Sequence, residues 1–141
     1  MLVRLMYASR ATDLVSHEAL SAILRKSMAN NPSAGVTGVL CFSGTIFLQV
    51  LEGGRSQVSA LYNKITRDPR HNDVILLSYE EISERSFAAW AMGQVNLNRL
   101  NPALLLKYSE AAVLDPYAVS GAVSMALFNE LVATAAVMCQ T

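Results

Sequence analysis

The chain has 141 residues, of which 52% are hydrophobic and 16% are charged. A chain of this size buries one sizeable core, so we expect a single domain with a modest extension. Its eleven basic residues balance eleven acidic ones, which argues against a nucleic-acid binder or a protein drawn to an anionic membrane.

The two cysteines and the N-terminus bear on the cellular compartment. Cys41 and Cys139 lack the spacing of a structural zinc site, and two cysteines do not make a disulfide framework. The first ten residues alternate like a strand and show no basic leader ahead of a long apolar core. We therefore expect a cytoplasmic protein.

The chain begins with a predicted strand and a predicted helix. Over residues 2–9, Val3, Leu5 and Tyr7 alternate with Leu2, Arg4 and Met6, and the β-branched and aromatic content suits a strand. Ser16 suits the N-cap of an amphipathic helix. Asn31 and Pro32 should end that helix near Asn30.

A hairpin follows this helix. Residues 36–42 and 45–51 are strand-like, and the link between them, Ser43 and Gly44, is short enough for a tight turn. Apolar side chains point to both sides of the second strand, so we expect both faces of the sheet to be buried there.

The next elements complete a recognisable order. Ser56 begins a second amphipathic helix, which Asp68 and Pro69 should end. Residues 73–82 and 89–97 predict a fourth and a fifth strand. The order βαββαβ plus one strand predicts an α+β fold, namely a ferredoxin-like mixed five-stranded sheet with two helices on one face.

The C-terminal part is apolar and helical in pattern. Between residues 117 and 138 the one charged residue is Glu130, and apolar residues recur at every fourth position, at Val119, Val123, Leu127 and Leu131. The segment approaches membrane-spanning length, but polar residues dilute it and no Lys or Arg flanks it, so we expect no membrane insertion. We divide the chain into a patterned domain, 1–97, and a C-terminal helical extension, 98–141, which covers the second sheet face or an interface.

Polar residues at core positions point to a binding site. Gln49 lies on a strand face that should be buried, and an unpartnered buried amide costs about 1 to 3 kcal/mol. Ser27 and Asn31 end the apolar stripe of the first helix, and Tyr7 lies in the layer between sheet and helices. These side chains are expected to converge on one cavity, although each alone also fits an ordinary core or helix-end position.

A second polar group follows the second helix. It comprises Arg67, Asp68, Arg70 and His71, which offer cations and donors suited to a ribityl hydroxyl or a phosphate. A solvated turn would have the same composition. The chain contains no phosphate-loop or GxGxxG fingerprint.

Six ordered motifs carry a family resemblance. They are RLMYAS at 4–9, NNP at 30–32, GVTGVLCFSG at 35–44, FLQVLEG at 47–53, DPRH at 68–71 and FAAWAMG at 87–93. Through them the chain resembles the BLUF family, sensors of blue light using FAD, over about residues 1–97, and looks like a short, stand-alone member.

The resemblance implies a role for each candidate residue. Tyr7 corresponds to the light-responsive tyrosine and Gln49 to the glutamine that bridges it to the flavin. Asn31 matches the residue that holds the ring edge, with Ser27 as a nearby polar position. The remaining implied positions are Ile23 and Ile65 on the two ring faces, Asn30 beside the ring, Arg67, Asp68, Arg70 and His71 near the ribityl and phosphate groups, and Trp90 and Met92 as strand-five residues that move in the photocycle.

The resemblance predicts a blue-light photoreceptor that binds FAD noncovalently, with FMN or riboflavin as alternatives. A Tyr/Gln hydrogen-bond switch would act through strand five on the C-terminal helices and an unidentified partner protein. We expect a homo-oligomer and no catalytic activity, because about 44 residues outside the domain are too few for a catalytic domain.

Two other functions stay open at this point. A ferredoxin-like fold of this size also suits a small-molecule-binding regulatory module without photochemistry. A small hydrolase using Arg4 or Arg70 with Asn31 is the enzymatic alternative, although no nucleophile and base pair is visible.

Overall fold

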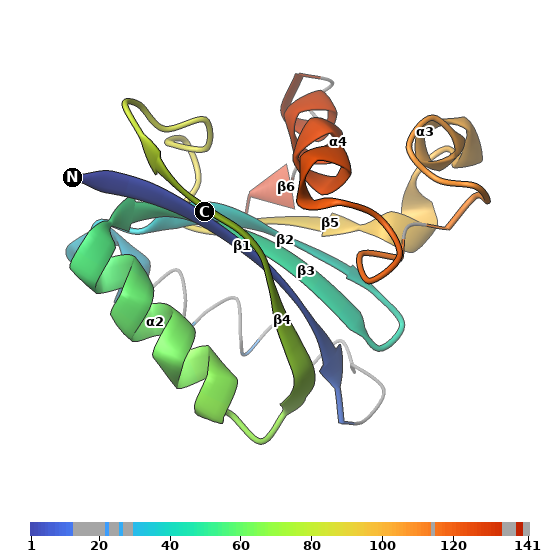
Figure 1. Ribbon diagram of the computed structural model, residues 1–141. Coiled ribbons are helices and arrows are strands. Elements are labelled where there is room, and N and C mark those ends of the chain that lie inside the picture. Colours follow the sequence, from blue (N-terminus) through green and yellow to red (C-terminus); the bar gives the residue numbers. More distant parts are fainter. Residues whose placement is uncertain (13–21, 23–25, 27–29, 114, 134–137, 140–141) are drawn as a thin grey trace.

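The protein was analysed as a computed structural model that describes residues 1–12, 22, 26, 30–113, 115–133 and 138–139. These residues form one sheet with helices on both faces (Figure 1). The strands are β1 (Leu2–Ala11), β2 (Thr37–Ser43), β3 (Ile46–Gly54), β4 (His71–Ile82), β5 (Gly93–Asn96) and β6 (Met138–Cys139). The helices are α2 (Arg55–Arg67), α3 (Pro102–Leu106), α4 (Gly121–Ala133) and the short 3-10 helix η1 (Leu97–Arg99).

The sheet confirms the predicted fold class. Its strand order among the described residues is β4-β1-β3-β2-β5-β6. The first four positions are antiparallel, whereas β5 runs parallel to β2, so the sheet is mixed. The two-residue strand β6, which pairs with β5, was not predicted, because two residues carry no readable alternation.

The β2–β3 hairpin differs from its prediction by one residue. Ser43 pairs with Ile46, so the link consists of Gly44 and Thr45 instead of Ser43 and Gly44. Gly44 has a φ of 57°. A left-handed backbone in a two-residue turn favours glycine, which explains why the turn is built around this residue.

The first helix continues further than predicted. Most of residues 16–29 lie outside the described part of the chain, but residues 30–34 are helical. The end comes at Gly35, where φ is 70°. There the Val36 N–H donates to the Asn31 carbonyl (2.9 Å) and the Gly35 N–H to the Pro32 carbonyl (3.2 Å). This is a Schellman-type ending, and the left-handed glycine, not Pro32, terminates the helix.

The prediction of a strand over 89–97 was wrong in its first half. Strand β5 begins only at Gly93. Before it, the Trp90 carbonyl accepts from the Gly38 N–H (3.1 Å), and the Ala91 carbonyl accepts from the Asn31 side chain (2.8 Å). Trp90 and Met92 therefore do not share one strand face. Met92 is buried in the core under α2, and Trp90 packs, partly buried, against the core on the opposite side of the sheet.

Each sheet face has its own core, as the apolar pattern of β3 predicted. The face toward α2 buries Val3, Leu5, Tyr7, Leu51 and Val58, with other residues. The opposite face lies under α4 and α3 (Figure 1).

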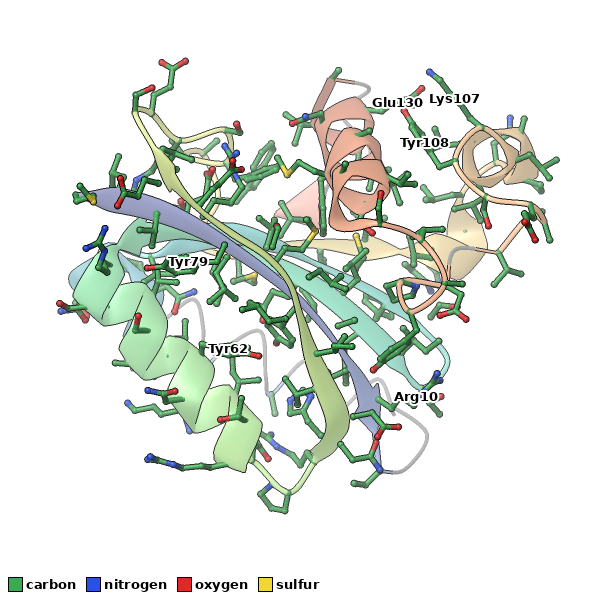
Figure 2. All side chains as sticks on the ribbon, in the orientation of Figure 1. Arg10, Tyr62, Tyr79, Lys107, Tyr108 and Glu130 are labelled. Carbon is green, nitrogen blue, oxygen red and sulfur yellow. The ribbon has the colours of Figure 1, made fainter. Side chains whose placement is uncertain are left out.

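Helices α3 and α4 of the C-terminal part pack on the second sheet face. Helix α4 buries Ser124, Leu127, Phe128 and Leu131, so its buried stripe differs from the predicted every-fourth-residue stripe. Tyr108 and Lys107 at the end of α3 both bond Glu130 of α4 (Figure 2). No helix within the described ranges is long and apolar enough to cross a membrane.

Candidate functional site

A cavity of about 660 Å³ opens on the α2 side of the sheet. This volume lies in the range of small-molecule and cofactor sites. Most of the predicted site residues line it, namely Tyr7, Asn30, Asn31, Gln49, Ile65, Arg67, Asp68, Arg70 and His71. Two further predicted positions, Ile23 and Ser27, lie outside the described residues.

A buried chain of hydrogen bonds runs along the sheet side of the cavity. Tyr7 of β1 lies directly opposite Gln49 of β3 in the strand register, so both side chains project from the same face. The Tyr7 hydroxyl donates to Oε1 of Gln49. The Gln49 Nε2 in turn donates to the sulfur of Met92 at 3.2 Å. Both polar side chains are almost completely buried, and their mutual bonds offset the cost of that burial.

Burial also sets the protonation of the phenol. Desolvation, together with the nearby Tyr62 and Asp68, raises the pKa of Tyr7 well above its usual value. The phenol consequently keeps its proton, which it donates to Gln49. Tyr62 extends from α2 toward the sheet (Figure 2) and places its ring centroid 5.7 Å from that of Tyr7.

Asn31 provides a second buried amide beside this chain. It is 3% exposed, and its Nδ2 donates to the Ala91 carbonyl at 2.8 Å. An amide side chain has two donor and two acceptor positions. The bonds to described residues use one position of Asn31 and two of Gln49.

The far end of the cavity is polar and charged. The Arg70 guanidinium forms a bidentate pair with Asp68 and lowers the pKa of that carboxyl to about 2. His71 contacts the Ser9 hydroxyl at 2.9 Å and stacks obliquely on Phe47. Burial lowers the pKa of His71, so its neutral form is favoured.

Sequence reasoning missed two cationic residues of the site. The described lining contains four cations, which are Lys26, Lys64, Arg67 and Arg70, against one carboxylate, Asp68. A neutral chain thus gathers positive charge around this cavity. Helical spacing puts Lys26 on the same helix face as Asn30, four residues later, and Lys64 near Asp68, but it does not by itself place that face beside a cavity.

Two candidate residues lie elsewhere. Trp90 packs on the opposite side of the sheet from the cavity. Arg4 bonds Glu52, Glu80 and Ser86 and does not line the cavity, so the pairing of Arg4 with Asn31 that a hydrolase would need is not formed.

Comparison with known proteins places the chain among light sensors. The family model described as "BLUF: Sensors of blue-light using FAD" matches residues 2–93. The photoactivated adenylate cyclase subunit beta of Euglena longa is 39% identical over 92 residues, which are 64% of this chain and 11% of that protein. The chain therefore spans about a tenth of this curated relative.

Two solved structures match over nearly their whole length. The structure titled "BlsA photo-activated state" has a TM-score of 0.81 at 31% identity and covers 93% of this chain and 94% of the other. The structure titled "BlrB - a BLUF protein, dark state structure" has a TM-score of 0.78 at 32% identity, covering 95% and 96%. The similarity to both structures thus extends beyond residues 2–93 into the C-terminal part of the chain.

Proposed function

Because this chain belongs to the BLUF family of blue-light sensors that use FAD, we propose that its cavity holds the flavin and that Tyr7, Gln49 and Met92 respond to light. The observation that carries the proposal is the buried chain of hydrogen bonds from Tyr7 through Gln49 to Met92. Such a chain beside a cavity places a proton donor, and an amide whose nitrogen and oxygen can exchange places, next to the ligand in that cavity.

The residues of the cavity fit a flavin. Asn31 and Gln49 line it as buried amides, the side chains that can both donate to and accept from the polar edge of a flavin ring. Ile65 and Leu61 supply apolar wall from α2, and the four cations suit a phosphate-bearing tail. We propose that Asn30, Arg67, Asp68, Arg70 and His71 also face the cofactor, with Ile23 and Ser27 as further proposed contacts.

The switch we propose belongs to the side chain of Gln49. When bound, the flavin supplies the absorption of blue light and the oxidising power that light creates. In the arrangement described above, Oε1 of Gln49 accepts the Tyr7 proton while Nε2 donates to Met92. If the amide reverses, its nitrogen faces Tyr7 and its oxygen faces a sulfur that cannot donate, so the bond to Met92 is lost.

The output is proposed to be a contact with another protein. Residues 1–97 would form the sensor domain, and residues 98–141 would transmit the signal to an unidentified partner, with Trp90 and Met92 near the route. We propose that the chain acts as a homo-oligomer and neither catalyses a reaction nor binds nucleic acid. The light-regulated cyclase subunit of Euglena longa supports a signalling role for the shared domain.

An absorption experiment on purified protein tests this function. We expect noncovalent flavin that denaturation releases, and a reversible red shift of its absorption in blue light. Tyr7→Phe should keep the flavin and abolish the red shift, because it removes only the hydroxyl that donates to Gln49. Tyr62→Phe is the matched control, since Tyr62 lies beside Tyr7 but does not bond Gln49, and its red shift should persist. Protein that takes up no flavin, or a normal red shift in Tyr7→Phe, would contradict the proposal.

A further inference from the structure

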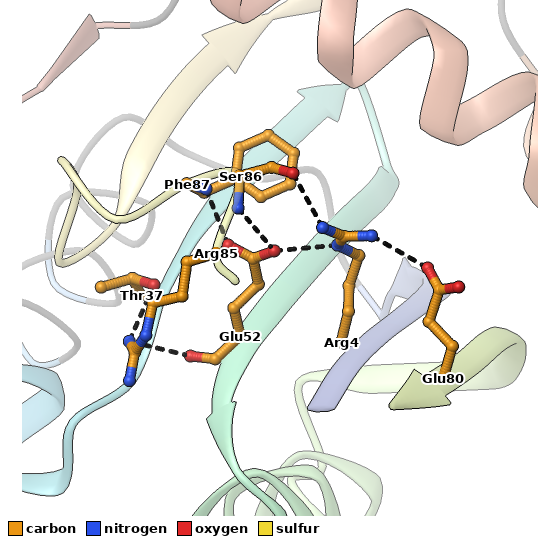
Figure 3. Close-up of polar contacts among 7 residues, drawn as sticks. All are labelled: Arg4, Thr37, Glu52, Glu80, Arg85, Ser86 and Phe87. Carbon is orange, nitrogen blue, oxygen red and sulfur yellow. Dashed lines mark hydrogen bonds and ion pairs between the residues drawn. The ribbon is translucent and has the colours of Figure 1, made fainter. Parts of the chain in front are cut away.

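A buried carboxylate holds the loop between β4 and β5, residues 83–92. Glu52 of β3 is completely buried. Its Oε1 accepts from the Phe87 N–H at 2.7 Å, and its Oε2 accepts from the Ser86 N–H at 3.1 Å and from Nε of Arg4 at 2.8 Å (Figure 3). A carboxylate out of water requires such donors, since an unpaired buried charge is strongly destabilising. The backbone of the loop is therefore fixed to the sheet at Ser86 and Phe87.

Two arginines reinforce this attachment (Figure 3). Arg4 also donates to the Ser86 hydroxyl at 2.8 Å and to the exposed Glu80 at 2.9 Å. Arg85 donates to the Thr37 hydroxyl at 3.1 Å and to the Gly35 carbonyl at 2.7 Å. The second arginine joins the loop to the turn that ends the helical segment carrying Asn31.

The other end of the loop is held by the flavin-side amides. Asn31 donates to the Ala91 carbonyl, and Gln49 donates to the Met92 sulfur. Gln49 and Glu52 belong to the same strand but project to opposite faces of it, as their separation by three residues requires. Strand β3 thus bonds this loop at two places, at Ser86–Phe87 through Glu52 and at Met92 through Gln49, once on each side of the sheet.

The middle of the loop contacts the C-terminal extension. Phe87 is completely buried, and its ring lies edge-on to that of Phe128 in α4, with centroids 6.0 Å apart. Trp90 packs against the same core. A displacement of the loop at Met92 would reach α4 through these rings, provided that the backbone at Ser86 and Phe87 stays fixed.

We propose that Glu52 is a positioning residue that fixes the backbone of the 83–92 loop at Ser86 and Phe87, so that a change at Gln49 and Met92 is passed to α4 through the side chains of Trp90 and Phe87. This inference rests on the proposed photosensory function. Glu52 acts on the signal through the loop and contacts neither the cavity nor Met92. Without the charge of Glu52, the backbone at Ser86 and Phe87 would yield to the displacement, and less of it would reach α4.

The test compares two Glu→Gln substitutions on partners of the same arginine. Glu52→Gln weakens the charge-assisted bonds to the loop. Glu80→Gln removes the charge of the solvent-exposed partner of Arg4, and the side chain of Glu80 is 53% exposed. Flavin absorption and amide hydrogen exchange of α4 are measured in dark and light on the same samples. We expect both variants to keep the flavin and its red shift, and Glu52→Gln alone to lose most of the light-minus-dark exchange difference in α4.

A second variant keeps the inference testable if Glu52→Gln does not fold. Phe87→Leu leaves the Glu52 bonds to the backbone in place and removes the ring contact with Phe128, so it should likewise retain the red shift and lose exchange coupling. Wild-type protein without any red shift would overturn the proposed function. Wild-type protein with a red shift but no light-dependent exchange in α4, or a full exchange difference in Glu52→Gln or Phe87→Leu, would overturn this inference alone.

Discussion

At the scale of single residues, Gln49 joins the two halves of the site. A tyrosine hydroxyl can donate or accept, and a thioether sulfur can only accept weakly. The amide between them has one donor end and one acceptor end, so its orientation decides which neighbour is satisfied. Because the site is buried, a neighbour left without a hydrogen bond lowers the stability of the fold by about 1 to 3 kcal/mol.

Asp68 gives a prediction about acid stability. Its bond with Arg70 lowers the pKa of the carboxyl from 3.8 to about 2 in the folded protein. The ionised form is therefore favoured by folding, and the stabilisation is present above about pH 4 and is lost as the pH falls toward 2. Because the Arg70 side chain is half exposed, solvent screening limits the contribution to about 1 kcal/mol or less.

Asp68→Asn tests this effect and keeps an oxygen for the Arg70 N–H. The variant should be less stable than the wild type near neutral pH. The difference in unfolding free energy between the two proteins should shrink as the pH falls through the range between 4 and 2. Urea unfolding at a series of pH values measures it, and a difference independent of pH would show that the ion pair contributes nothing.

Individual site residues were predictable where the burial of polar groups made them conspicuous. Gln49 and Tyr7 follow from strand alternation, and Asn31 follows from the stripe of the first helix. Lys26 and Lys64 were missed because long basic side chains on an amphipathic helix also suit a solvated face. Their place beside the cavity depends on how the helices rotate against the sheet, which the local pattern does not specify.

At the scale of elements, the regular strands were predictable and the 83–92 loop was not. The alternation of β1 and the hairpin of β2 and β3 set their limits to within a few residues. Residues 89–92 are equally apolar, yet their carbonyls bond to Asn31 and Gly38 in place of a strand partner. Such tertiary hydrogen bonds leave no trace in local periodicity.

Ser120, directly before α4, and Ser124, within it, are predicted to have opposite effects on stability when replaced by alanine. Ser120 accepts from the Val123 N–H at 3.2 Å in the N-cap position. The Ser124 hydroxyl is buried without a hydrogen-bond partner in the described part of the chain. Ser120→Ala should therefore lower the free energy of unfolding by about 1 kcal/mol, and Ser124→Ala should raise it by about 1 kcal/mol.

The comparison is internally matched, because both changes remove one hydroxyl from the same helix. Thermal or urea unfolding of the flavin-bound protein measures the two effects. Destabilisation by Ser124→Ala would mean that the hydroxyl has a partner in solution. Unchanged stability in Ser120→Ala would mean that the Ser120 side chain does not stabilise this helix as an N-cap.

At the scale of the whole molecule, the sheet separates the cavity from the core under α4. One face carries Tyr7, Gln49 and Met92, and the other carries Trp90 and Phe87 with α4. The predicted strand over 89–97 would put Trp90 and Met92 on one face, because residues two apart on a strand point to the same side. The irregular backbone ahead of β5 puts their side chains on opposite sides.

This separation predicts different effects for two conservative variants. Met92→Leu keeps the volume and removes the sulfur that accepts from Gln49, so it should change the size or the dark recovery of the red shift. Trp90→Phe reduces packing against the α4-side core and leaves the Gln49 bonds in place. It should preserve the red shift and weaken the light-dependent change in amide exchange of α4.

The two measurements, absorption and exchange, distinguish the faces because each reports on one side of the sheet. A red shift that is altered in Trp90→Phe and normal in Met92→Leu would reverse the assignment of the two residues. Equal effects of both variants on both measurements would mean that the segment from Trp90 to Met92 moves as one unit. The expected pattern, with absorption sensitive to Met92 and exchange sensitive to Trp90, requires the signal to pass along the backbone between those residues, where the carbonyls of Ala91 and Trp90 bond Asn31 and Gly38.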